Sequence, residues 1–307
     1  MQIKRNFFGP NNLNLNSHIL ITGISGKVGS MCFTSLKNNS DISCEILGTY
    51  NATEIKGQKY LDITNSRNID KIFTEFKPQI LIHTAALVHP LKCEQNRKLA
   101  WKTNVESVKN LVQKCKEFSC KMVFLSSDSV YEEKNSPLIE SDPVIATNYY
   151  SKTKIEAEKI IMELEDYLII RTAWINDVNL HSKSFVMQVL NSLKNNKIFS
   201  APDDYFGHPT LSSNLVEIII ELIIKNKSGI FNVAGLTYID RYNFALKIAD
   251  SFNLDSKLIK PVSSENLDTM PRPLRINLNL EKLSSQISTK ILSLSEQLTY
   301  MKSQNIF

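Results

Sequence analysis

Short apolar segments alternate along the chain with longer segments in which apolar residues recur at helical spacing. The apolar segments are HILITG, CEILGTY, QILIHTAA, KMVFLSSD and YLIIRTAW, at 18–23, 44–50, 79–86, 121–128 and 167–174. Strands that are buried on both faces of a sheet give such continuous runs instead of a strict alternation. Helical patterns separate the runs, as over 98–118. The alternation predicts an α/β fold with a doubly wound parallel sheet.

The pattern changes after Trp174, where helices mix with loops rich in Asn, Ser, Pro and Asp. We therefore expect a sheet domain over 17–173, followed over 174–307 mostly by a smaller C-terminal α/β domain that binds the substrate. The apolar segment GIFNVAG at 229–235 is a candidate late strand. We expect the stretch of about 208–237 to return to the first domain and complete its sheet.

Composition and charge narrow the class of protein. Apolar residues make up 42% of the 307 residues, enough for a sizeable core, and the net charge of +5 comes from basic residues spread along the chain. The five cysteines show neither a C-x-x-C pair nor zinc spacing, which favours a reducing compartment. The N-terminal 18 residues lack the apolar core of a signal peptide, and no apolar run is long enough to span a bilayer. We expect a cytoplasmic protein that binds neither nucleic acid nor membranes.

A glycine-rich loop, ITGISGKVG, follows the first predicted strand and opens a helix. Gly23, Gly26 and Gly29 are spaced three apart, and they are three of only 9 glycines in the chain. Glycines in this context let the backbone approach a pyrophosphate, which then meets the free N–H groups of the helix N-terminus. A flexible turn with incidental glycines is the alternative. The rarity of glycine elsewhere favours a Rossmann-type dinucleotide site.

The end of the second predicted strand bears on the choice of dinucleotide. NAD sites usually have an Asp or Glu there for the ribose 2′-hydroxyl, but this strand ends with Tyr50 and Asn51. No Arg stands there for a 2′-phosphate, although Lys27 is nearby. We expect NADPH, with NADH as the alternative. Asp62, after the next short apolar segment, is placed to accept a hydrogen bond from the adenine amino group, or to cap the following helix.

Tyr150 and Lys154 form a candidate catalytic pair within NYYSKTK. At i, i+4 they share one face of a helix, and we expect the Lys ammonium to lower the pKa of the phenol so that it exchanges protons near neutral pH. Ser126 and Ser127 end the fourth predicted strand, where open α/β sheets place ligands. Tyr149 competes with Tyr150, but it has a threonine at i+4. Taken alone, a Tyr–Lys pair at this spacing usually marks two polar residues on the solvated surface of a helix. The glycine loop and the serines make it a candidate site for carbonyl reduction.

These residues resemble the extended short-chain dehydrogenase/reductases, and most of all the dTDP-4-dehydrorhamnose reductase family of sugar-nucleotide-binding proteins. The resemblance runs from about residue 18 to 300. It is carried by the ordered blocks TGISGKVG, HTAA, SSDSVY, YSKTKIEAE, RTAWI, FGHPT and RPLRINLNLEKL.

The resemblance implies a role for each matching residue. Ser127 would orient the substrate oxygen, Tyr150 would donate the proton, and Lys154 would activate Tyr150 and bind the ribose. Substrate contacts would be Ser127, Asp128, Trp174 and Arg272, although from the sequence alone Trp174 could equally pack in the core. The expected cofactor-binding residues are Gly23, Ser25, Gly26, Lys27, Val28, Gly29, Tyr50, Asn51, Asp62, Ile63, Ala85, Ala86, Tyr150 and Lys154.

The implied activity is NAD(P)H-dependent reduction of a 4-keto-6-deoxy nucleotide sugar in deoxysugar or polysaccharide biosynthesis, with a homodimer as a candidate assembly. Two alternatives stay open: a nucleotide-sugar epimerase, and a non-catalytic dinucleotide-binding subunit like the regulatory subunit of methionine adenosyltransferase. A dehydratase is disfavoured, because Ser129 stands where related dehydratases carry Glu. Some members of the family dimerise through a metal held by a Glu. The corresponding segment here, GSMCF, has no acid, so we expect no metal site.

Overall fold

A seven-stranded parallel sheet forms the centre of the computed structural model, which describes residues 17–39, 44–177, 179, 182–266 and 270–304. The N-terminal segment without a signal-peptide pattern lies almost wholly outside these residues. The strand order is β11-β6-β5-β4-β1-β2-β3, which confirms the predicted Rossmann-type doubly wound α/β fold. The strands are β1 (Ser17–Thr22), β2 (Cys44–Tyr50), β3 (Lys59–Tyr60), β4 (Ile80–His83), β5 (Lys121–Ser127), β6 (Tyr167–Thr172) and β11 (Gly229–Asn232).

Both faces of the sheet are buried, which explains why its strands are continuously apolar. Within β1, Ile19 and Ile21 enter the core on one face, while Leu20 enters the core on the other. β4 repeats this alternation, with Leu81 on the side of Leu20. Because successive side chains point to opposite faces, a strand between two helical layers must be apolar at every position.

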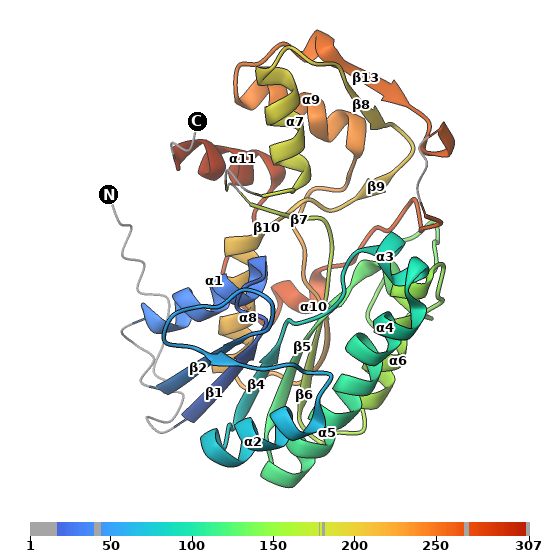
Figure 1. Cartoon of the computed structure of the whole chain (residues 1–307). Helices are drawn as coiled ribbons and strands as arrows, with labels where there is room; N and C mark the ends of the chain where they lie inside the picture. The colour runs from blue at the N-terminus through green and yellow to red at the C-terminus, as the bar shows by residue number, and fades with distance from the viewer. Residues whose placement is uncertain (1–16, 40–43, 178, 180–181, 267–269, 305–307) are drawn as a thin grey trace.

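Helices cover both faces of the sheet (Figure 1). α1 (Lys27–Lys37) packs with α8 (Ser212–Ile224) on one face. On the other face, α5 (Ser107–Phe118) packs between α2 (Ser66–Phe76) and α6 (Tyr149–Ile161). α8 and β11 follow Trp174 in the sequence, so the chain returns to the sheet after it has left it.

The long predicted helical segment at 98–118 is interrupted. α4 (Arg97–Trp101) passes through a π-helical turn, Lys102–Glu106, into α5. The extra residue in this turn brings the side chain of Asn104 inward, where it is buried. The sequence pattern shows the helix but not this turn, because the apolar spacing continues on both sides of it.

A second, smaller group of elements packs around its own apolar core beyond the carboxyl ends of the strands (Figure 1). Its largest helices are α7 (Phe185–Lys194), α9 (Arg241–Ser251) and α11 (Leu294–Ser303). β8 (Phe199–Pro202) pairs in parallel with β13 (Ile259–Val262). The remaining elements are α3 (Pro90–Gln95), β7 (Ile175–Asn176), β9 (Phe206–Gly207), β10 (Thr210–Leu211), β12 (Ile239–Asp240) and α10 (Glu281–Ser284), with 3₁₀ turns at Asp128–Val130, Ser256–Leu258 and Ser264–Asn266.

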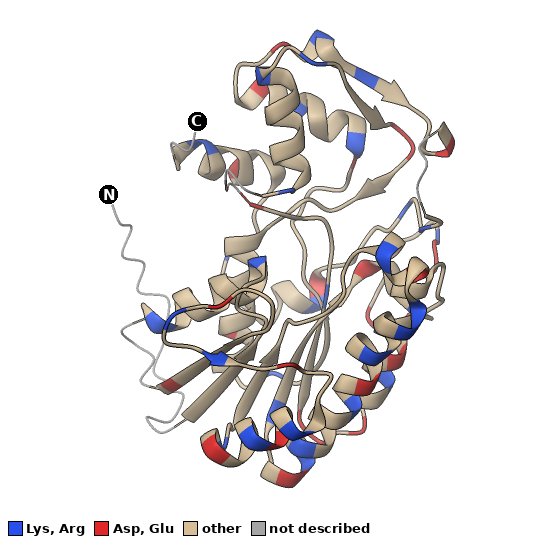
Figure 2. Ribbon diagram, viewed as in Figure 1, with Lys and Arg blue, Asp and Glu red and all other residues tan. Residues whose placement is uncertain are grey.

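Charged side chains of both signs are interspersed on the outer surfaces of the helices. Figure 2 shows this most clearly on α2 and α5, where Lys and Arg alternate with Asp and Glu. In the part of the chain that the structure describes, no helix is both long and apolar enough to cross a membrane.

Candidate functional site

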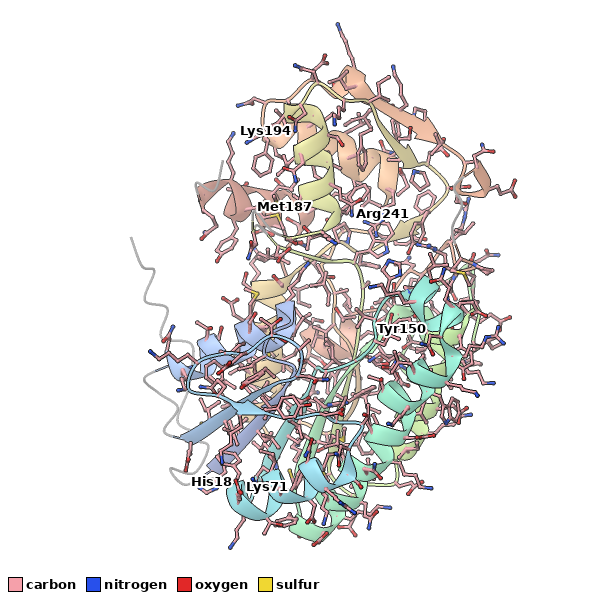
Figure 3. All side chains as sticks on the ribbon, in the orientation of Figure 1. His18, Lys71, Tyr150, Met187, Lys194 and Arg241 are labelled. Atoms are coloured by element: carbon pink, nitrogen blue, oxygen red, sulfur yellow. The ribbon has the colours of Figure 1, made fainter. Side chains whose placement is uncertain are left out.

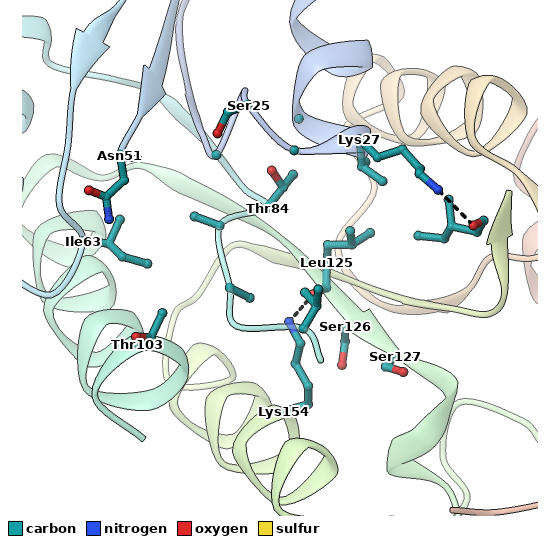
Figure 4. A pocket seen from close by; sticks show the side chains of 18 of the residues that line it. Ser25, Lys27, Asn51, Ile63, Thr84, Thr103, Leu125, Ser126, Ser127 and Lys154 are labelled. Atoms are coloured by element: carbon teal, nitrogen blue, oxygen red, sulfur yellow. Dashed lines mark hydrogen bonds between the residues drawn. The ribbon is translucent and has the colours of Figure 1, made fainter. Parts of the chain in front are cut away.

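A cavity of about 930 Å³ opens at the carboxyl ends of the parallel strands and brings together nearly all the predicted site residues (Figure 4). This is where open α/β sheets bind ligands, beside the point where the strand order reverses between β1 and β4. Of the predicted residues, those that line it are Gly23, Ser25, Gly26, Lys27, Val28, Gly29, Tyr50, Asn51, Asp62, Ile63, Ala85, Ala86, Ser127, Asp128, Tyr150, Lys154 and Trp174. Arg272 does not line this cavity.

The glycine loop has the geometry of a cradle with no room for side chains. Gly23 has a φ of +77°, and a Cβ there would lie 2.9 Å from the backbone of Ala85. A Cβ on Gly29 would lie 2.6 Å from Oγ1 of Thr84 and would also meet the Gly23 carbonyl oxygen. α1 begins directly after Gly26, so its first N–H groups face the cavity. The loop therefore fits a pyrophosphate group bound at a helix N-terminus.

One end of the cavity, called the distal end below, lies at the ends of β2 and β3 and is lined by Tyr50, Asn51 and Asp62. Oδ1 of Asp62 accepts hydrogen bonds from the N–H and the hydroxyl of Thr64, at 2.9 and 2.8 Å. Asp62 does not cap α2, because the cap is Asn65, whose side chain accepts a hydrogen bond from the N–H of Arg67. The helix-cap alternative for Asp62 is therefore wrong.

Lys27 points away from this distal end. Its Nζ lies 2.9 Å from Oδ1 of Asp177 and 3.4 Å from the carbonyl oxygen of Ile175, on the far side of the glycine loop (Figure 4). Lys27 thus lines the cavity but does not face Tyr50 and Asn51, where a 2′-phosphate would lie. The lysine lends no support to the choice of NADPH over NADH.

The start of α6 is fixed by a reciprocal cap that places Tyr150 in the first turn. The Asn148 side chain accepts a hydrogen bond from the N–H of Ser151, and the Ser151 hydroxyl oxygen accepts one from the N–H of Asn148. Tyr150 then faces the cavity. Tyr149 instead packs against Arg97 of α4, with the guanidinium 5.2 Å from the ring centroid. The structure therefore separates the two adjacent tyrosines as the sequence suggested.

The two serines at the end of β5 are also separated. Ser126 also lines the cavity, but it is buried and its hydroxyl donates a hydrogen bond to the carboxylate of Glu158. Ser127 faces the cavity and interacts through its side chain with Tyr150. Its hydroxyl donates to Oδ1 of Asp128 at 3.1 Å and accepts from the hydroxyl of Ser129 at 2.9 Å. Ser127 is thus the serine that can hold a substrate oxygen beside Tyr150.

The pKa of Tyr150 is shifted in the direction opposite to our expectation. Burial raises it above its ordinary value, the carboxyl group of Asp128 adds to the rise, and the side chain of Ser127 opposes it. In the protein alone, desolvation of the phenolate therefore outweighs any stabilisation by Lys154, whose Nζ lies 6.0 Å from the Tyr150 ring centroid. Tyr150 is held as a neutral phenol, the form that a proton donor needs.

Lys154 lines the cavity and is almost fully buried. Its Nζ donates to the carbonyl oxygen of Leu125 at 2.7 Å and lies 4.4 Å from the centroid of the Phe124 ring (Figure 4). Burial lowers the pKa of Lys154 to about 8, with Glu158 and Cys93 opposing the shift. The amine is thus an ammonium at neutral pH, but one that titrates close to it.

Asn104 is a site-supporting residue that sequence reasoning missed. From the π-helical turn, its amide N–H donates to Oγ1 of Thr153 on α6 and to the carbonyl oxygen of Leu87, both at 3.0 Å. Its Oδ1 accepts from the N–H of Leu87 at 2.8 Å. Asn104 therefore ties α6, which carries Tyr150 and Lys154, to the loop after β4. A polar residue within an apolar helical pattern was the available signal.

Trp174 occupies a strained position where β6 leaves the sheet. Its φ is +36°, unusual for a residue with a large side chain. The ring stacks on Phe244 at a centroid distance of 6.4 Å and lies so close to Gly207 that a Cβ there would be 2.5 Å from Cε2 of Trp174. Trp174 is thus both a packing residue and a wall of the cavity.

Arg272 lines a second cavity of about 530 Å³, which shares Lys27, Trp174 and Ile175 with the first. Its Nε donates to the carbonyl oxygen of Met270 at 3.3 Å. The predicted residue is therefore next to the dinucleotide cavity rather than in it.

The fold and the cavity together define a Rossmann-type nucleotide-binding protein with a Tyr–Lys–Ser group at the strand ends. The sequence-family model of the RmlD substrate binding domain matches residues 17–305, and the chain belongs to this family. This finding confirms the resemblance stated from the sequence blocks.

Individual relatives are similar at low identity. The chain is 27% identical over 274 residues to "Methionine adenosyltransferase 2 subunit beta" of Xenopus tropicalis, which covers 86% of this chain and 80% of that protein. It is also 27% identical over 242 residues to "dTDP-4-dehydrorhamnose reductase" of Aggregatibacter actinomycetemcomitans, and the matched region covers 76% of this chain and 79% of that protein. A solved structure, a hypothetical dTDP-4-dehydrorhamnose reductase from Sulfolobus tokodaii, matches with a TM-score of 0.82 at 30% identity, over 91% of this chain and 98% of that one.

Proposed function

We propose that this protein is an NAD(P)H-dependent reductase that acts on the keto group of a nucleotide sugar. The proposed substrate class is a 4-keto-6-deoxy nucleotide sugar, and the proposed role is in deoxysugar or polysaccharide biosynthesis. The observation that carries the proposal is the presence of Tyr150, Ser127 and Lys154 in the same cavity as the glycine loop. The reductase from Aggregatibacter actinomycetemcomitans and the Sulfolobus tokodaii structure support it as relatives.

The position of each side chain in the cavity supports the role that we propose for it. A bound reduced nicotinamide would supply the hydride. Ser127 holds the substrate carbonyl oxygen beside Tyr150, and the neutral phenol of Tyr150 donates the proton to that oxygen as it becomes an alkoxide. The ammonium of Lys154 stabilises the phenolate that remains, since an opposite charge nearby favours the ionised form. Asn104 holds α6, and with it Tyr150, at the required position.

An NADPH-oxidation assay against a panel of 4-keto-6-deoxy nucleotide sugars tests this proposal. Wild type is expected to oxidise NADPH with at least one member of the panel. Tyr150→Phe should lose about 10²–10⁴-fold in kcat, the usual contribution of a positioned proton donor. Tyr149→Phe is the matched control and should behave as wild type, because Tyr149 packs against Arg97 outside the cavity. Equal activity of the Tyr150 variant and wild type would refute the assignment.

The similarity to methionine adenosyltransferase 2 subunit beta favours one other candidate function, a dinucleotide-binding subunit that assists a synthetase without catalysis. Size-exclusion chromatography tests this candidate function. The protein is mixed with a methionine adenosyltransferase catalytic subunit, and formation of a complex is measured. A stable complex together with no turnover of any keto-sugar nucleotide would favour this candidate. Turnover without a complex would exclude it.

A further inference from the structure

Ser129 lies directly behind the serine that faces the cavity. Residues Asp128–Val130 form a 3₁₀ turn at the end of β5, and Ser127 is the residue that caps the start of this turn. Ser127 lines the cavity, whereas Ser129 does not. Any effect of the Ser129 side chain on a bound ligand must therefore pass through Ser127.

The hydroxyl oxygen of Ser127 has both of its acceptor positions occupied. It accepts one hydrogen bond from the N–H of Ser129 at 3.2 Å and a second from the hydroxyl of Ser129 at 2.9 Å. A serine hydroxyl has two lone pairs and one proton. The proton of Ser127 goes to Oδ1 of Asp128 at 3.1 Å. Ser127 therefore accepts from Ser129 and donates only in the other direction.

The carboxylate of Asp128 sets this direction. An ionised carboxylate only accepts hydrogen bonds, so the bond between Ser127 and Asp128 uses the proton of Ser127. Because that proton is already used, the bond between the two serines has to use the hydroxyl proton of Ser129. Burial raises the pKa of Asp128 to about 6, which leaves the carboxylate as the main form at neutral pH. The donors thus run from Ser129 to Ser127 to Asp128.

The direction of the Ser127 hydrogen bonds affects the neighbouring phenol of Tyr150. Figure 3 shows Tyr150 at the end of the sheet domain that faces the smaller group of elements. The Ser127 side chain acts to lower the pKa of Tyr150 against the larger effect of burial, as a donor to the phenolate oxygen does. A free lone pair on Ser127 would instead accept the Tyr150 proton and turn it away from a substrate. Ser129 leaves no such lone pair free.

We propose that Ser129 is a positioning residue of the reduction, whose hydroxyl keeps Ser127 a hydrogen-bond donor and so keeps the Tyr150 proton directed at the substrate oxygen. When a keto substrate binds, the Ser127 proton turns from Asp128 to the carbonyl oxygen, while both hydrogen bonds from Ser129 stay in place. The O–H bond of Tyr150 then breaks, and its proton goes to the former carbonyl oxygen. The inference rests on the proposed function for this reaction, but the direction of the hydrogen bonds can be measured without turnover.

The kinetics of Ser129 variants test the role in the reaction. Ser129→Ala should lower kcat for the keto-sugar nucleotide about tenfold, roughly the effect of one misdirected hydrogen bond, and should change KM less than about twofold. Ser129→Thr keeps the hydroxyl and should restore the rate. Ser129→Val has nearly the shape of Ser129→Thr without the hydroxyl and should stay as slow as Ser129→Ala. Equal kcat values for Ser129→Thr and Ser129→Val would overturn the proposal, because a role in packing or in the turn depends on shape.

A titration of the phenol at position 150 measures the direction of the hydrogen bonds without any substrate. A fluorinated tyrosine, whose phenol is more acidic than that of tyrosine, is placed there in the full chain, and ¹⁹F NMR follows its ionisation alone. Without the Ser129 hydroxyl, Ser127 can accept from the neutral phenol, which stabilises the neutral form. Ser129→Ala should therefore raise the titration midpoint by up to about one pH unit. Ser129→Thr should keep the midpoint of the protein with Ser129.

Other ionisable groups around this phenol stay the same in the titration. They are Asp128 on the 3₁₀ turn, Cys93 on α3 and Lys154 on α6. Near-UV circular dichroism and NADPH affinity show which variants pack as wild type does. A shift of the midpoint in such a variant therefore reports on the hydroxyl that was removed.

The two measurements separate this inference from the proposed function. If no keto-sugar nucleotide is reduced, the reductase proposal fails, while a raised midpoint in Ser129→Ala still supports the assigned direction of the hydrogen bonds. If wild type reduces a keto-sugar nucleotide and Ser129→Ala keeps the full kcat, the reductase stands and the positioning role fails. Equal midpoints with and without the Ser129 hydroxyl would overturn the inference in either case.

Discussion

Replacing Glu158 with Gln tests how the structure supports α6, the helix that carries Tyr150 and Lys154. Glu158 lies on α6, one turn after Lys154, and its carboxylate accepts hydrogen bonds from Nε and Nη2 of Arg171 on β6. The hydroxyl of Ser126, at the end of β5, donates to the same carboxylate. Both side chains of the ion pair are almost fully buried, with relative exposures of 4% and 2%. The pair therefore joins α6 to two adjacent strands directly behind the cavity.

The expected loss of stability follows from this burial. Removing one partner of a buried pair leaves the other charge without compensation, and such changes cost about 3–5 kcal/mol. Gln can still accept one hydrogen bond from Arg171 through its amide oxygen, but the guanidinium loses its counter-charge and keeps otherwise the hydrogen bond from Nη1 to the carbonyl oxygen of Glu140 and the nearby ring of Tyr131. A protein of ordinary stability, about 5–15 kcal/mol, would lose a large part of its free energy of unfolding. Because Glu158 also raises the pKa of Lys154, the variant should titrate Lys154 at a lower pH.

Urea unfolding followed by circular dichroism measures the effect. The matched control is Glu163→Gln, which removes an ion pair of similar length, 2.9 Å to Lys116, between side chains that are 60% and 49% exposed. It should change the midpoint little, because exposed pairs are well solvated before and after the change. The double variant Glu158→Leu with Arg171→Met should recover most of the stability. Equal effects of the Glu158 and Glu163 substitutions would refute the argument from burial.

Four further predictions concern the residues of the cavity. Gly29→Ala should weaken dinucleotide binding at least tenfold in a titration of NADPH fluorescence, because the new Cβ would meet the carbonyl oxygen of Gly23. Unchanged affinity would contradict the assignment of the glycine loop as the pyrophosphate site. Gly207→Ala should displace Trp174 and alter its fluorescence and the KM for the sugar nucleotide, while leaving NADPH affinity unchanged. The kcat/KM for NADPH should fall as pH rises through about 8, where Lys154 loses its proton, and a pH-independent value up to pH 10 would contradict this role. The unfolded chain binds more protons than the folded one between pH 8 and 10.5, so Lys154 should make stability rise with pH over that window while activity falls.

The sequence was sufficient to predict the sheet, and it named residues that the structure brings together in one cavity, because both depend on local patterns. Continuous apolar runs indicate strands buried on both faces, and the positions of Gly29 and Tyr150 relative to a strand end follow from the order of elements. Of the two adjacent tyrosines, Tyr150 lines the cavity and Tyr149 does not, since a one-residue shift along a helix turns a side chain by about 100°. These predictions required no knowledge of tertiary distances.

The features that were missed depend on contacts between distant parts of the chain. Arg241 of α9 packs on Trp174, 67 positions earlier in the sequence, and no local pattern indicates this contact. The direction of the pKa shift at Tyr150 was wrong because burial, which the sequence does not measure, outweighs the neighbouring charge. Asn104 was missed because a π-helical turn leaves no clear mark in apolar spacing.

Transfer of hydride to the sugar tests the central claim most directly. The protein is incubated with a 4-keto-6-deoxy nucleotide sugar and NADPH deuterated at the hydride-donating carbon, and the sugar product is examined by mass spectrometry and NMR. We predict that deuterium appears on the former keto carbon with wild type and with Tyr149→Phe, and that its appearance is at least a hundredfold slower with Tyr150→Phe. Binding of both ligands by wild type without any transfer of deuterium, across the panel of keto sugars, would contradict the account.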